Sequence, residues 1–145
     1  MDFHSIKDDM QVDLQLMDID GDNETLYGSG CDMAGYEGVV FLATCRRGEA
    51  ATLTLKAQQD TDSGYGTAAD LVGTGVSLVI ATGTDGFAAL EIKNPKERYV
   101  RPAVVVPNLG TARAVAVMSI RYGAKYRPET NSDMELHVNP AEGTA

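Results

Sequence analysis

Short apolar runs separated by polar turns recur along the chain, and most of them alternate apolar with polar residues. Residues 52–58 (TLTLKAQ) show this alternation clearly. A period of two is typical of a β-strand that buries one face. The apolar run 39–44 precedes it across a turn that contains Gly48. Two such runs joined by a short glycine-containing turn predict a β-hairpin.

The same pattern predicts further strands over residues 12–17, 76–81, 87–92, 98–106 and 112–122. We expect the second and third of these to form another hairpin, because Asp85-Gly86 between two apolar runs is a strong hairpin signal. The stretch 18–30 is expected to be a polar loop with a short extended piece at 25–27, and residues 67–72 are expected to form one helical turn.

Three of these strands carry additional information. In the first, Val12, Leu14 and Leu16 fall on one face, and the other face is expected to be wet. Pro102 lies within the fourth strand and cannot donate a ladder hydrogen bond, so that strand is an edge or contains a bulge. The last strand, 112–122, is apolar on both faces and needs cover on both. A neighbouring subunit can supply the second cover, which indicates an oligomer.

About eight strands at turn-punctuated spacing, with almost no helix, predict an all-β fold: a β-sandwich that is jelly-roll-like. The 145 residues suffice for one domain with a buried core. We place the sandwich at residues 11–127. It follows an N-terminal arm (1–10) with room for a single helical turn, and it precedes an extended C-terminal tail (128–145).

The net charge of −9 is concentrated near the N-terminus, because residues 1–45 hold ten acidic residues and one lysine. Such a segment repels nucleic acid and steers towards basic protein surfaces, or it is simply a solvated face. No apolar run approaches the roughly 20 residues of a membrane helix, and Asp2 stands where a signal peptide would be basic. We expect synthesis and folding in a cytoplasm, and neither nucleic acid nor membrane as a partner.

Candidate catalytic chemistry is sparse. The two histidines, His4 and His137, both lie in the predicted arms, and Glu91 is the only carboxylate that stands out within an apolar strand. A catalytic group needs a rigid setting, which a terminal arm does not provide. We therefore expect a protein that is not an enzyme and binds no cofactor, with a hydrolase that uses Glu91 as a remote alternative.

Residues 18–24 resemble the start of a calcium-binding loop. The EF-hand pattern needs glycine where this chain has Asn23 and glutamate where it has Ser29, so we expect no metal site. Cys45, at the end of an apolar strand, is expected to be a small buried hydrophobe, and a bridge between Cys31 and Cys45 is left open.

Three motifs occur in a fixed order: GYEGVVF at 35–41, AADLVG at 68–73 and ERYVRP at 97–102. With the Val-rich and Ala/Val-rich strands that follow, the chain resembles, over about residues 30–128, small virion structural proteins of tailed bacteriophages known as capsid decoration or cement proteins. The resemblance implies a β-sandwich bound to the outside of an icosahedral head as a dimer or trimer, with no catalytic residue and no cofactor. The acidic leader and the long tail depart from the family pattern.

This resemblance implies that the protein lies on the capsid surface of the virion and stabilises contacts between subunits of the major capsid protein. Its expected partners are that protein and copies of itself. The two arms and the arginines near strand ends are the candidates for capsid or subunit contacts, namely Phe3, Ile6, Arg98, Arg101, Arg127, Met134 and Leu136. The alternative is a carbohydrate-binding module of a tail or adhesin, which the absence of tryptophan disfavours and which would use Tyr27, Tyr36 and Tyr65.

Overall fold

The computed structural model describes residues 5–126, 131, 133–139 and 141–142. Within them the chain is all-β apart from one helical turn, which confirms the predicted fold class. The elements are α1 (Ile6–Asp9), β1 (Gln11–Gly21), β2 (Glu24–Tyr27), β3 (Cys31–Asp32), β4 (Gly38–Cys45), β5 (Ala51–Asp60), β6 (Ala69–Asp70), β7 (Val76–Ile80), β8 (Gly86–Lys93), β9 (Tyr99–Val106) and β10 (Arg113–Tyr122).

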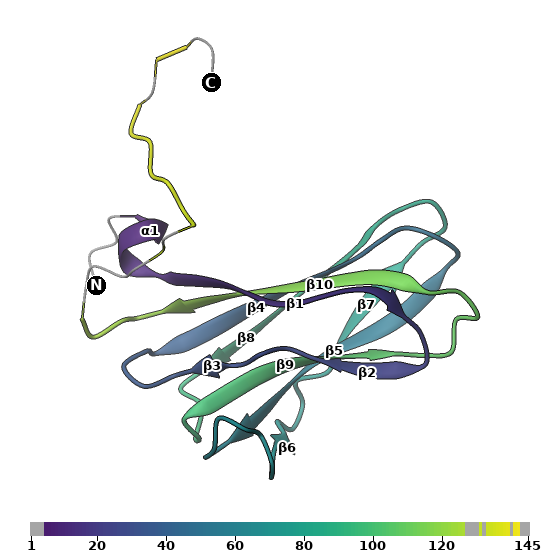
Figure 1. Ribbon diagram of the computed structural model, residues 1–145, viewed down its shortest axis with the longest axis horizontal. Helices are drawn as coiled ribbons and strands as arrows, with labels where there is room; N and C mark the ends of the chain where they lie inside the picture. Colours follow the sequence, from purple (N-terminus) through teal and green to yellow (C-terminus); the bar gives the residue numbers. More distant parts are fainter. Residues whose placement is uncertain (1–4, 127–130, 132, 140, 143–145) are drawn as a thin grey trace.

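Two antiparallel sheets pack face to face (Figure 1). Sheet A has the strand order β1-β10-β4-β8, and sheet B has the order β2-β9-β5-β7, with β3 beside β9 and β6 beside β5. Along the chain the eight longer strands fall in sheets A, B, A, B, B, A, B and A. This alternation between two four-stranded layers is the jelly-roll arrangement, as the strand pattern predicts.

Neither predicted hairpin forms. β4 pairs with β10 and β8 in sheet A, whereas β5 pairs with β9, β6 and β7 in sheet B. The second pair is divided in the same way, because β7 lies beside β5 and β8 lies beside β4. In a jelly roll the chain changes sheet at such corners. A short glycine-containing turn can serve either a hairpin or a corner, so the local sequence did not separate the two.

The strand that contains Pro102 is not an edge. β9 lies in the middle of sheet B, between β5 and the β2/β3 pair. On the latter side β2 stops at Tyr27 and pairing resumes at Cys31, so the missing N–H of Pro102 falls in an interruption of the neighbouring strand. Gly28 closes this gap by donating its N–H to the Pro102 carbonyl at 2.9 Å. A Cβ at Gly28 would lie 2.6 Å from the proline ring, so the close approach requires glycine.

Two local predictions are also corrected. β1 continues through the acidic stretch as far as Gly21, so residues 18–21 are strand and not loop. Residues 69–70 form the short strand β6 where a helical turn was predicted, because they pair with β5. The helical turn allowed for in the N-terminal arm is present as α1, and Ser5 caps it by accepting a hydrogen bond from the Asp8 amide.

The core lies between the two sheets and is built from inward-facing aliphatic residues and one phenylalanine. Its fully buried members include Val39, Phe41, Leu53, Leu55, Leu78, Ile80, Val100, Val104, Val115 and Val117. Cys31 and Cys45 are both buried and carry free thiols, so the possible bridge between them is not formed. Burial raises the pKa of both thiols. In the described part of the chain no helix is long and apolar enough to cross a membrane.

The core assignment can be tested with two matched valines of sheet B. Val104 is fully buried, whereas Val79 is 61% exposed. Val104→Ala removes two buried methyl groups and leaves a cavity, so we expect it to lower the free energy of unfolding by about 2 kcal/mol. Val79→Ala should change it by less than about 0.5 kcal/mol. Urea unfolding measures both, and equal effects of the two substitutions would contradict the assignment.

Candidate protein-interaction surface

A β-bulge in β1 changes which of its side chains face outwards and which face the core. Leu14 pairs with Met118 of β10, but Leu16 pairs with the adjacent Val117, so β1 contains one extra residue between them. As a result Leu14 points outwards and is 57% exposed, whereas Gln15 is buried. The single apolar face predicted for this strand is therefore wrong.

The outward-facing positions of sheet A form an almost entirely apolar surface, which we call the apolar face. Side chains from all four strands lie in rows across it: Val12–Ile120–Val40–Glu91, Leu14–Met118–Leu42–Ala89 and Met17–Ala116–Thr44–Phe87. At its edges Met17 is 69% exposed and Phe87 is 63% exposed. Contiguous exposed apolar surface of this extent marks a site of interaction with another molecule.

The outer face of sheet B has the opposite character. Its rows carry mainly polar side chains: Thr25–Val105–Thr54–Ser77, Tyr27–Ala103–Lys56 and Arg101–Gln58–Asp70. Lys56 and Gln58 both bind the carboxylate of Asp70, and these hydrogen bonds lower its pKa. A half-polar sheet of this kind is stable in water without further cover. The outer face of sheet A is therefore the more apolar of the two.

The predicted contact residues Arg98 and Arg101 both lie on the side of sheet B. The Arg98 guanidinium donates two hydrogen bonds, of 2.9 and 2.8 Å, to the carboxylate of Asp32. This interaction lowers the pKa of Asp32. Arg101 donates twice to the Gln58 side-chain oxygen, at 3.0 and 2.8 Å. Both guanidinium groups are thus engaged within the chain, away from the apolar face.

The three tyrosines of the carbohydrate alternative do not form a common stacking platform. The Arg101 guanidinium lies over the rings of both Tyr27 and Tyr65, at 4.2 and 4.7 Å from their centroids. Tyr36 is covered in the same way by Arg121, at 4.7 Å. Burial raises the pKa of Tyr65 to about 12. One ring face of each tyrosine is therefore already occupied by an arginine.

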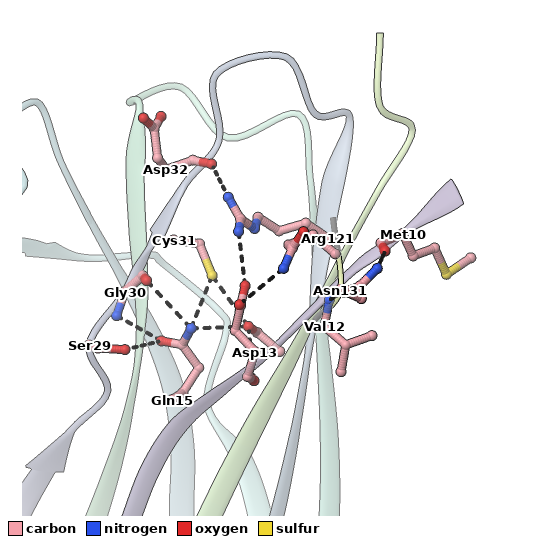
Figure 2. A network of polar contacts seen from close by, with 12 residues as sticks. Met10, Val12, Asp13, Gln15, Ser29, Gly30, Cys31, Asp32, Arg121 and Asn131 are labelled. Carbon is pink, nitrogen blue, oxygen red and sulfur yellow. Dashed lines mark hydrogen bonds and ion pairs between the residues drawn. The ribbon is translucent and has the colours of Figure 1, made fainter. Parts of the chain in front are cut away.

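A network of buried polar groups joins the two sheets near one end of the apolar face (Figure 2). The Gln15 amide nitrogen donates to the Ser119 hydroxyl at 3.0 Å and to the Cys31 sulfur at 3.3 Å. The Gln15 carbonyl oxygen accepts from the Gly30 amide at 2.7 Å. Because β1 and β10 belong to sheet A and Cys31 to sheet B, these bonds hold the layers together here.

Arg121 extends the network towards the surface. Its guanidinium donates to the carboxylate of Asp13 and to the backbone carbonyl of Asp32, both at 2.8 Å (Figure 2). Arg121 therefore links the neighbouring strands β1 and β10 of sheet A to β3 of sheet B.

Asn131 anchors the C-terminal tail to the start of β1. Its buried side chain accepts a hydrogen bond from the Val12 amide at 2.9 Å and donates to the carbonyls of Lys7 and Met10, both at 2.7 Å (Figure 2). The Lys7 ammonium group returns the contact by donating to the Met134 carbonyl at 2.8 Å. No pattern in the sequence indicates this anchor, since an asparagine in a polar tail is common and its partners lie far away along the chain.

The described candidates from the two arms lie at this same end of the sandwich. Ile6 is 44% exposed on α1, and Leu136 is 48% exposed in the tail. Met134 lines a groove together with Leu14 and Met118 of the apolar face. The structure thus separates these arm residues from the two arginines on sheet B. Phe3 and Arg127, also predicted as contact residues, lie outside the described residues.

Comparison with known proteins gives similarity of fold. No protein-family model and no curated protein matches the chain. The structure is similar to that of the PBSX exported protein XepA, with a TM-score of 0.57 and 16% sequence identity. The match covers 91% of this chain and 44% of that one, so this chain spans less than half the length of that protein.

A more distant similarity is to Bacillus endospore appendages, which form a family of disulfide-linked pili. Here the TM-score is 0.41 and the identity 12%, over 84% of this chain and 96% of the other. At this distance the likeness supports no argument about this chain.

The anchor can be tested by replacing Asn131 with alanine. The substitution leaves the Val12 amide and two carbonyls without a partner. We therefore expect the free energy of local unfolding at this end of the sandwich to fall by about 1–3 kcal/mol. Hydrogen exchange at the Val12 amide should accelerate, and the tail should be cleaved faster by proteases. Asn139→Ala, in the exposed part of the tail, is the control. Unchanged exchange at Val12 in N131A would contradict the assignment.

The Asp32–Arg98 pair predicts a pH dependence of stability. Because the folded-state pKa of Asp32 lies below its ordinary value of 3.8, the stabilisation is present above that value and is lost as the pH falls through the folded-state pKa. The effect is small, as for other exposed pairs. Urea unfolding should show Asp32→Asn less stable than the wild type at pH 7, with the difference shrinking towards pH 2. A difference that grows in acid would contradict this sign.

Proposed function

We propose that this chain is a structural protein of a tailed-bacteriophage particle that decorates the outer surface of the head. In this role it binds the major capsid protein and copies of itself, and it stabilises contacts between capsid subunits. The observation that carries the proposal is the apolar face, which gives a small jelly roll a large surface suited to protein contact. The order of the motifs GYEGVVF, AADLVG and ERYVRP supports it, as does the fold shared with a PBSX exported protein.

Binding to an assembled shell is sufficient for this role. A protein that binds the assembled shell and not its free subunits stabilises the shell by mass action. Each contact can be weak, because the symmetry of the shell repeats it many times. The proposal needs neither a catalytic residue nor a cofactor. Glu91, the carboxylate of the hydrolase alternative, is exposed and accepts a hydrogen bond from the Tyr122 hydroxyl.

Acidic residues outnumber basic ones at the end of the sandwich where β1 stops, which suits association with a basic surface. Arg46, Arg47 and Arg113 lie at the same end, but Arg47 pairs with Asp85 and Arg113 is buried. Asp18, Asp20, Asp22 and Glu24 lie within and after the last part of β1, and Asp20 and Glu24 are exposed. Clustered charge of one sign accelerates encounter with an oppositely charged surface and weakens with salt. We therefore assign to this end the steering of the protein towards the head.

The proposal predicts salt-sensitive binding to heads. Purified protein mixed with phage heads that lack it should sediment with them, and raising the salt from about 0.05 M to about 0.5 M should weaken binding about tenfold. Asp20→Asn with Glu24→Gln should weaken binding at low salt. Asp62→Asn with Glu142→Gln removes the same charge from exposed sites away from this end and is the control.

Two results would count against the proposal. Absence of sedimentation with heads at every salt concentration would refute head decoration. Equal effects of the two double substitutions would refute the steering role of the acidic end and leave head binding in place.

A further inference from the structure

The tail beyond the anchor has the pattern of a strand with one apolar side. Met134, Leu136 and Val138 alternate with polar residues, which is the period of an extended segment. Val138 is 81% exposed and Leu136 is 48% exposed. The same chain therefore carries two apolar surfaces that need cover, the apolar face of sheet A and one side of residues 135–139.

The anchor fixes the direction in which the tail leaves. The Met134 amide donates to the Asn131 carbonyl at 3.2 Å, and Lys7 holds the carbonyls of both residues from α1, at 2.8 Å to Met134 and 3.4 Å to Asn131. Asn131 and Met134 are thus both fixed to the helix. Met134 still lines the groove beside its own apolar face, and beyond it residues 135–139 run away from both sheets (Figure 1). Leu136 and Val138 therefore stay exposed and do not cover the sheet of their own chain.

From these observations we infer that residues 135–139 of one copy lie across the apolar face of a neighbouring copy of this chain. The apolar side of the arm then covers the rows of sheet A, and Glu135 and His137 stay in water. This inference rests on the self-association in the proposed function and is independent of capsid binding. If the arm of each copy binds the apolar face of the next, the copies form either a dimer or a closed ring.

The areas fit this arrangement. Four strands about 4.8 Å apart, each about eight residues long at about 3.3 Å per residue, give the apolar face an area of about 500 Å². A stable interface buries about 800 Å² on each partner. An arm of residues 135–139 is about 17 Å long when extended, which is about two thirds of the length of an eight-residue strand in sheet A. The face and the arm together approach the area that a stable assembly needs, and the face alone falls short.

The test begins with the mass of the purified full-length protein in solution, measured by size-exclusion chromatography with light scattering. The chain has a mass of 15.4 kDa, and we expect a multiple of this value. The double substitution Leu136→Asp with Val138→Asp, and separately Met118→Asp on the apolar face, should each reduce the mass to that of one chain. A wild-type protein with the mass of a single chain would overturn the inference.

Two control variants alter exposed positions outside the proposed contact. Val79→Asp adds a carboxylate to an exposed apolar position on sheet B, and Glu135→Gln alters the polar side of the arm. Both should retain the mass of the assembly. If the arm variant also retains it, the arm is not part of the contact and the inference is wrong. Circular dichroism verifies that Met118→Asp is folded.

A second measurement identifies the occupant of the apolar face even if the face variant fails to fold. A photo-crosslinking amino acid is placed at Leu136, and ¹⁴N-labelled and ¹⁵N-labelled chains are mixed before irradiation. We expect crosslinks to β1, β10, β4 or β8 that join a light peptide to a heavy one. Crosslinks only within chains of one label would show that the tail covers its own sheet, and crosslinks elsewhere would show that it covers neither; both overturn the inference. Neither measurement uses phage heads, so failure here is distinct from failure of the decoration role.

Discussion

Sheet A carries apolar side chains on both of its faces, and the rest of the molecule is arranged around this constraint. Its inner face packs against sheet B to form the core, through residues such as Phe41 and Val117. Its outer face has the same apolar character, whereas the outer face of sheet B is polar. A sheet that is apolar on both sides needs cover on both. One layer of cover comes from the chain itself, and we assign the other to protein partners.

Two clusters of hydrogen-bonded polar groups lie at one end of the sandwich, beside the apolar face. The Gln15–Cys31–Ser119 cluster joins the two sheets at one end, and Asn131 ties the tail to the start of β1 at the same end. Satisfied buried polar groups fix a unique geometry, because leaving any of them without a partner is costly. The anchor therefore gives the tail a defined point of departure beside the apolar face. This combination suits a protein whose role is to hold neighbours together.

The fold class could be predicted because apolar alternation in each strand is a local property of the sequence. Which strands pair is not local, and so the hairpins expected around Gly48 and Asp85 are in fact corners between sheets. The apolar face was only partly predictable. The doubly apolar pattern of β10 indicated it, but the bulge after Leu14 reversed the outward residues of β1. Asn131 could not be found from the sequence, because its three partners come from the other end of the chain.

In the assembled phage particle, we expect the apolar face to be covered by protein. An electron cryomicroscopy reconstruction of the phage particle tests this most directly. The account predicts density for this jelly roll on the outer surface of the head, with the outer face of sheet A buried against protein in every copy. A particle that lacks the chain, or one in which that face is open to solvent while sheet B makes the contacts, would contradict it.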